Sequence, residues 1–196
     1  MMGMIFSISY LAMISDNNLI QTSSLMQLKD KPPKQAISLL LLGLRQDGIE
    51  TRSLCCSGLM VEYDQISWSL LQLVLSSDEN AIIRAEAIDS VTQQSIIYGW
   101  NTIRQSFIKD LSRLVRRVIL SVVLQQPQIP ARWLMDLSKL AIVDNDRIIR
   151  VNGTEIFGRL IRECPDQAKE ALEILMRLKG DIDSRVAASA TNSLYR

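Results

Sequence analysis

The chain of 196 residues contains no histidine. Histidine is the commonest general base in enzymes, the usual partner of a nucleophilic serine and the commonest zinc ligand, so its absence excludes these sites in their usual form. The sequence also has no glycine-rich phosphate loop and no paired-cysteine metal motif. Independent hydrolytic or nucleotide-driven chemistry is therefore not expected.

Cysteine is scarce, with Cys55, Cys56 and Cys164 alone in the chain. Two of them are sequence neighbours and the third has no counterpart, so a disulfide framework is not expected. We therefore expect the protein to reside in a reducing compartment. The first residues are apolar but carry no Lys or Arg before Lys29, and serines interrupt the run. We therefore expect neither a secretory signal nor a membrane span, and predict a cytoplasmic protein.

Charge of one sign is also lacking, because 22 Lys and Arg residues face 21 Asp and Glu residues, a net charge of +1. Such a chain offers no overall field for nucleic acid or for an anionic membrane. Binding to either would need a local patch, and we predict no nucleic-acid partner.

What the chain does contain is a repeat. Apolar residues precede an arginine, and small or apolar residues follow at helical spacing, in five places, with intervals of 32, 32, 34 and 35 residues between the arginines. The five arginines are Arg52, Arg84, Arg116, Arg150 and Arg185. A period of this length indicates one supersecondary unit per repeat.

Each repeat predicts two helices. In the three clearest copies an aspartate stands six residues before the arginine, at Asp78, Asp110 and Asp144, where its side chain could cap the following helix. Amphipathic stretches precede each copy at 35–44, 67–75, 98–107, 131–141 and 167–178, and Pro33, Pro130 and Pro165 stand just ahead of three of them. No alternating run predicts a strand.

This pattern of Asp, apolar residues, Arg and an alanine-rich helix resembles the HEAT-repeat family, in its PBS-lyase HEAT-like form, over residues 33–196. The resemblance implies an all-α fold, a right-handed α-solenoid of about five HEAT-like helix pairs. Residues 1–32 are then an N-terminal extension, partly disordered or helical.

The resemblance also implies a function. HEAT-repeat subunits of phycobiliprotein bilin lyases act with a partner chain on a linear tetrapyrrole (bilin), without a permanently bound cofactor. By this resemblance the partner would be a phycobiliprotein subunit of the phycobilisome or a second HEAT-repeat chain. Arg113 and Arg117 could then bind propionates, and Asp89 or Glu155 could bind pyrrole nitrogens.

A second hypothesis is a non-enzymatic adaptor or assembly chaperone that binds another protein through its concave face. Whether the chain is an enzyme stays open at this point. A third hypothesis, a nucleic-acid binder, is disfavoured by the balanced charge.

Several residues admit two interpretations. The repeat arginines could bind carboxylates on a partner, or form a structural ladder with the acidic caps of neighbouring repeats. The basic cluster could contact an anionic group or be a solvated helix face; it comprises Arg104, Lys109, Arg113, Arg116 and Arg117. Tyr98 and Trp100 could anchor a partner or pack against the next repeat, whereas Trp68, Trp133, Cys55 and Cys56 are predicted to be core.

Overall fold

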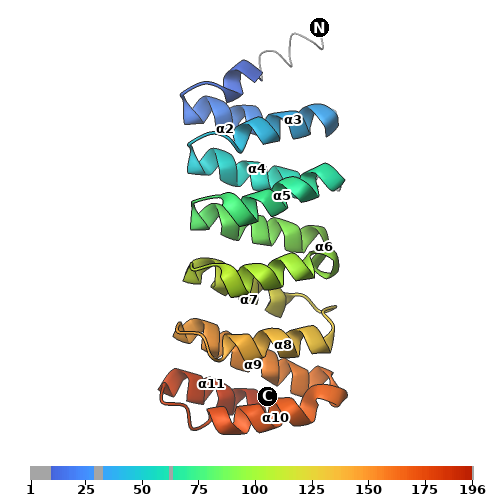
Figure 1. Cartoon of the computed structure of the whole chain (residues 1–196), viewed down its shortest axis with the longest axis vertical. Helices are drawn as coiled ribbons and strands as arrows, with labels where there is room; N and C mark the ends of the chain where they lie inside the picture. The colour runs from blue at the N-terminus through green and yellow to red at the C-terminus, as the bar shows by residue number, and fades with distance from the viewer. Residues whose placement is uncertain (1–9, 29–32, 62–63, 196) are drawn as a thin grey trace. The chain divides into compact units, whose positions relative to one another are not determined.

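The computed structural model describes residues 10–28, 33–61 and 64–195, and in these ranges the regular structure is entirely helical. The chain divides into two compact units, residues 1–102 and 103–196. Figure 1 shows that successive helices within each unit run antiparallel and are joined by short turns. The two units are described separately below.

The first unit contains α2 to α5 and most of α6. Helices α2 and α3 both pack on α4, and α5 packs on α3 and α4. Their bounds are α2 (Asn18–Met26), α3 (Pro33–Gly43), α4 (Ile49–Val61), α5 (Gln65–Ser77) and α6 (Ala81–Lys109). Ser95 has φ −169° and ψ 107°, so α6 consists of two helical segments that meet at this residue. The break falls at the end of the polar run Gln93 to Ser95.

The second unit contains the end of α6 and five further helices: α7 (Arg113–Gln125), α8 (Ala131–Ala141), α9 (Arg147–Glu163), α10 (Pro165–Leu178) and α11 (Ser184–Tyr195). Helix α9 packs on all four of the others. Helices α7, α9 and α11 are neighbours in one layer, and α8 and α10 are neighbours in the other. This layering makes the starts of α7, α9 and α11 one edge of the unit.

Close packing around α9 depends on its two glycines. A Cβ on Gly153 would lie 3.0 Å from Cβ of Ala141 and 3.3 Å from the backbone nitrogen of Ile142, at the end of α8. A Cβ on Gly158 would lie 2.8 Å from Cβ of Ser193 in α11. Glycine at these two positions therefore lets helices of both layers approach the α9 backbone.

The bounds predicted from the sequence agree well with the structure for the helices that begin at or just after a proline. Helix α8 has the predicted bounds 131–141 and follows Pro130, and Pro165 is the first residue of α10, where a missing N–H breaks no intrahelical bond. Among the described residues no helix is long and apolar enough to cross a membrane. Trp68, Cys55 and Cys56 are buried as predicted, and Trp133 is half-buried.

Candidate functional site

The repeat arginines tie consecutive turns together within each unit. Arg116 Nη1 donates to the carbonyl oxygen of Asp110 at 2.8 Å, and Arg116 Nε donates to Oδ2 of Asp144 at 2.7 Å. Arg150 Nη1 donates to the carbonyl oxygen of Asp144, and its Nη2 donates to Oδ2 of Asp183 at 3.2 Å. Each guanidinium thus bonds to the turn before its own helix and to the turn of the next repeat.

The first unit has the same arrangement. Arg52 Nη1 donates to the carbonyl oxygens of Gln46 and Asp47, and Arg52 Nε lies 3.0 Å from Oδ2 of Asp78. Arg84 Nη1 donates to the carbonyl oxygen of Asp78 at 2.8 Å. These contacts favour the structural interpretation of the arginines over partner binding, because the guanidinium donors are already used inside the chain.

A glutamine makes the equivalent contact in α2. Gln21 Nε2 donates to the carbonyl oxygen of Ser15 at 2.6 Å, six residues back, as the arginines do. Gln21 Oε1 accepts from Thr51 Oγ1 in α4 at 2.8 Å. The repeated contact therefore extends to α2, inside the predicted N-terminal extension 1–32, of which residues 1–9 and 29–32 lie outside the described residues.

The capping role predicted for Asp78, Asp110 and Asp144 needs correction. Their Oδ1 atoms accept the backbone N–H two residues on, at 2.8 Å in each case, and so close a turn. The helix N-cap is the residue two positions later, as in Asp146, whose Oδ1 accepts from Ile148 and Ile149. All three aspartates order their turns, and Asp78 and Asp144 also receive the arginine of the previous repeat, Arg52 and Arg116.

Arg185 does not occupy the position of the other four arginines. Asp183 accepts the backbone N–H of Arg185, two residues on, and the backbone oxygen of Asp183 accepts from Ala187. In the preceding repeat the backbone N–H of Arg150 donates to the backbone oxygen of Asp146 in the same way. The position equivalent to Arg150 is therefore Ala187 and not Arg185. Arg185 is exposed, and its membership of the ladder was an error of register.

The two arginines proposed for propionates differ in their surroundings. Arg117 Nε donates to Oδ1 of Asp146 at 3.0 Å and its Nη2 contacts Oδ2 of the same carboxylate. This hydrogen bond raises the pKa of Arg117 and lowers the pKa of Asp146 below its usual value. Arg113, the first residue of α7, is exposed.

The two carboxylates proposed for pyrrole nitrogens lie in different units. Asp89 is in the first unit, half-buried, and accepts from Gln93 Nε2 one helical turn later at 2.5 Å. Glu155 is in the second unit and is exposed on α9.

The aromatic pair does not act as a pair on the surface. Trp100 is 3% exposed and therefore belongs to the core, which favours the packing interpretation of this residue over the partner anchor. Tyr98 is 64% exposed, and its ring centroid lies 4.6 Å from that of Trp68. Tyr98 alone stays available at the surface.

The adjacent cysteines Cys55 and Cys56 are expected to be unreactive. Burial, with a smaller effect of Glu86 and Asp78, raises the pKa of Cys56 to about 12. Burial also raises the pKa of Cys55 above its usual range. Since the thiolate is the reactive form, neither thiol is expected to act as a nucleophile near neutral pH.

A polar groove crosses α9 and α11 in the second unit. One hollow of about 400 Å³ is lined by Leu124, Gln125, Pro127, Glu155, Arg159, Arg162, Glu163 and Ser193. A second of about 310 Å³ is lined by Val151, Glu155, Arg185, Ala188, Ser189, Asn192 and Ser193. The hollows share Glu155 and Ser193, and we call the combined surface the α9–α11 groove.

Arg159 holds one wall of this groove. Its Nη2 donates to the carbonyl oxygen of Pro127 at 2.9 Å, its Nη1 donates to that of Val123 at 3.3 Å, and its Nε donates to Glu163 at 2.7 Å. Only 7% of Arg159 is exposed. No local sequence pattern marks this residue, because its bonds to the carbonyl oxygens of Val123 and Pro127 join α9 to residues more than 30 positions earlier.

Other groove side chains remain available for binding. Within the ranges that the structure describes, Glu155, Arg162 and Asn192 are exposed and have no hydrogen bond to the protein. Arg162 Nη1 lies beside Gly158, near Ser193. The groove therefore offers a carboxylate, a guanidinium and an amide, which are acceptors and donors for a bound molecule. The described residues contain no cluster of three potential metal ligands.

Comparison with known proteins supports the fold. No protein-family model matches the chain, and no curated protein matches it. The crystal structure of AlkD2 from Streptococcus mutans is similar over 100% of this chain and 97% of its own length, with a TM-score of 0.52 and 12% sequence identity. The predicted all-α, HEAT-like solenoid class is confirmed; its handedness and repeat number stay predictions.

Proposed function

We propose that the chain is a protein-binding module that holds a segment of a partner polypeptide in the α9–α11 groove. The observation that carries the proposal is the continuity of the groove, whose two hollows meet at Glu155 and Ser193. Together they run from the end of α7 to the start of α11.

The chemistry of the lining supports a polypeptide as the ligand. A peptide main chain needs both donors and acceptors, and Glu155, Arg162 and Asn192 supply them. Val151 and Ala188 are short apolar side chains in the same lining, so a main chain can approach the helices closely. Arg159 and Gly158 keep the floor fixed through contacts inside the protein, so little ordering is needed on binding.

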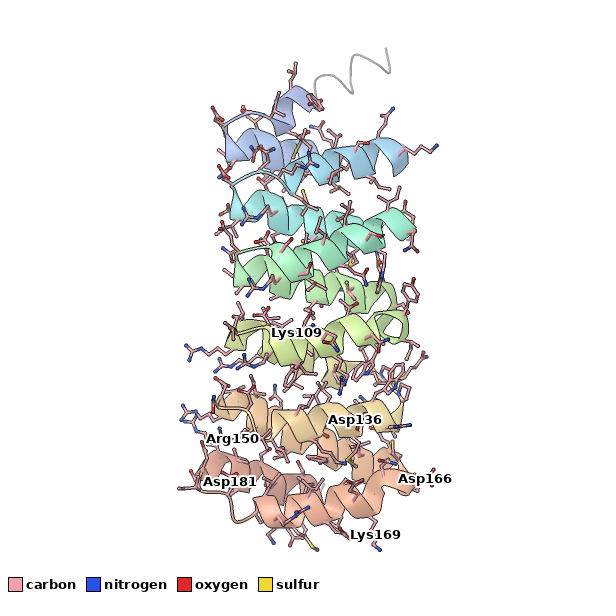
Figure 2. All side chains as sticks on the ribbon, in the orientation of Figure 1. Lys109, Asp136, Arg150, Asp166, Lys169 and Asp181 are labelled. Carbon is pink, nitrogen blue, oxygen red and sulfur yellow. The ribbon has the colours of Figure 1, made fainter. Side chains whose placement is uncertain are left out.

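Photo-crosslinking tests this proposal. A photoreactive amino acid placed at Asn192 should crosslink a specific protein from the native cell extract, and Glu155 should give the same adduct. The control position is Asp136, which is exposed on α8 in the other layer of the same unit (Figure 2). Equal adducts from Asn192 and Asp136, or none from Asn192 and Glu155, would rule the groove out.

The more specific proposal is a maturation factor or bilin lyase subunit whose partner is a phycobiliprotein subunit or a second HEAT-repeat chain. It is supported by the sequence resemblance and by the exposure of Arg113 and Glu155. A linear tetrapyrrole added to the purified chain should then change its visible absorption, and Arg113→Ala should weaken the change. An unchanged spectrum would leave the adaptor or chaperone role, with the same groove.

A further inference from the structure

The second unit carries most of the positive charge of the chain. Residues 103–196 contain 16 Lys and Arg residues and 11 Asp and Glu residues, a net charge of +5. Residues 1–102 contain 6 and 10, a net charge of −4. The value of +1 for the whole chain therefore hides a basic unit, which can attract an anionic partner by itself.

Part of this charge lies on the edge formed by the turns before α7, α9 and α11, which we call the turn edge. Ion pairs join the three turns: Arg116 with Asp144, Arg117 with Asp146, and Arg150 with Asp183. Figure 2 shows Arg150 and Asp181 at this edge. The pairs place the turns side by side and neutralise three of the edge carboxylates.

Three further arginines of the turn edge lie outside these pairs. Arg113 and Arg147 are the first residues of α7 and α9, and Arg185 is the second residue of α11. All three are exposed, and in the described ranges none of them forms an ion pair. Among the described residues, the turn edge therefore presents one exposed arginine in each of the three turns that is not held in an ion pair.

Aliphatic side chains project from the same turns. Leu111 is 96% exposed, Val143 is 76% exposed and Ile182 is fully exposed. Each lies within four residues of one of the exposed arginines, and none of the three lines a hollow of the groove. Single exposed aliphatic residues are common on protein surfaces, but here one occurs in each of three neighbouring turns.

We propose that the turn edge docks on the surface of an anionic lipid bilayer. The arginines would contact lipid phosphates and carboxylates, while Leu111, Val143 and Ile182 would enter the boundary between headgroups and acyl chains. A row of protruding aliphatic side chains, one from each turn, fits the surface of a bilayer better than the pocket of a protein partner. The combination of cations and aliphatic tips is what distinguishes a lipid surface from a purely ionic partner.

The test is flotation of the purified full chain with vesicles. Binding is expected to vesicles of phosphatidylcholine containing about one third phosphatidylserine, to weaken as salt rises, and to be absent on phosphatidylcholine alone. The variant Arg113→Ala with Arg147→Ala should lose about twentyfold or more in affinity, roughly fivefold for each cation. Both positions lie outside the α9–α11 groove, so peptide binding in the groove should be retained, and Arg147→Ala alone also leaves the proposed bilin contact of Arg113 intact.

A second variant tests the aliphatic contribution. Leu111→Ser with Ile182→Ser keeps every charge and should reduce vesicle binding at least about tenfold. The matched control is Arg132→Ala with Met176→Ser, which removes an exposed cation and an exposed apolar side chain from the α8–α10 layer. Because all these side chains are exposed, unchanged helical circular dichroism should accompany each variant.

Three results would overturn the proposal. They are no flotation with anionic vesicles, equal flotation with neutral vesicles, and equal loss in the control variant. Binding to polyglutamate without vesicle binding would also overturn it and would indicate an acidic protein partner.

Discussion

Arg116 donates two hydrogen bonds to Asp144, at 2.7 Å and 3.2 Å, and so joins the start of α7 to the turn before α9. Asp144 in turn accepts the backbone N–H of Asp146, the N-cap of α9. One bidentate ion pair therefore fixes both the spacing of two repeats and the conformation of the turn between them. The same geometry positions α9, on which the groove is built.

Arg116→Ala should destabilise the second unit by about 2 kcal/mol, because it removes this pair and leaves the carbonyl oxygen of Asp110 without its guanidinium donor. Chemical denaturation followed by circular dichroism measures the change. Arg113→Ala, at an exposed position three residues earlier, is the control and should change stability by less than about 0.5 kcal/mol. Equal losses in the two variants would contradict the role given to Arg116.

The register of the last repeat gives a separate prediction. Arg150→Ala should lower the denaturation midpoint clearly, because Arg150 bonds to the carbonyl oxygen of Asp144 and to Asp183. Arg185→Ala should leave the midpoint nearly unchanged, since Arg185 is exposed at the second position of α11. Comparable destabilisation by Arg185→Ala would restore Arg185 to the ladder.

The error at Arg185 shows where the sequence pattern reaches its limit. Counting from one arginine to the next predicted the helix pairs and the buried faces, because these depend on local periodicity. The register of the last repeat instead depends on which backbone N–H groups Asp181 and Asp183 receive. Arg185 comes four positions after Asp181, whereas Arg150 comes six positions after Asp144. The conformation of the last turn is set by its aspartates and not by the position of the arginine.

The groove was only partly predictable. Glu155 was a candidate from its position on a helix, and it does line both hollows. Arg159 and Ser193 could not be found in this way, because their place depends on packing between α9, α11 and the turn at Pro127. The basic character of the second unit was also missed, since the repeat continues through residue 103 and does not mark the boundary on either side of which the charges must be counted separately.

Gly153 is expected to tolerate no branched side chain. Gly153→Val should cost about 2 kcal/mol or more, because its Cβ alone would lie 3.0 Å from Ala141 and 3.3 Å from the backbone of Ile142. Gly180→Val is the matched control, since the nearest atom to a Cβ there is 3.6 Å away and no glycine has positive φ among the described residues. The control should change stability by less than about 1 kcal/mol.

The pair between Arg117 and Asp146 should make stability depend on acid pH. The pKa of Asp146 is lowered in the folded chain, chiefly by the hydrogen bond from Arg117, so the pair stabilises the fold above the ordinary carboxyl pKa of about 3.9. That contribution is lost as pH falls through the lowered pKa. Asp146→Asn keeps an oxygen for the N-cap and should be destabilised at pH 7.

The comparison across pH separates charge from capping. The stability difference between the natural chain and Asp146→Asn should shrink as the pH is lowered below about 4. A difference that stays constant from pH 7 to acid would show that Asp146 acts only as a helix cap.

The cysteines should differ sharply in reactivity. Burial raises the pKa values of Cys55 and Cys56, whereas Cys164 is only half-buried. A thiol reagent near neutral pH should therefore label one cysteine in the native chain, and Cys164→Ser should abolish that labelling. Mass spectrometry of the labelled peptides measures this, and rapid labelling at Cys55 or Cys56 would contradict their placement in the core.

The most direct test of the account is the effect of groove variants on the adduct obtained by crosslinking. Partner capture from native extract should be compared for the natural chain, for Glu155→Arg with Asn192→Trp, and for Asp136→Arg, all with the same helical content. We predict that the groove variant loses the partner and that Asp136→Arg retains it. Undiminished capture by the groove variant would contradict the assignment of the α9–α11 groove as the binding site.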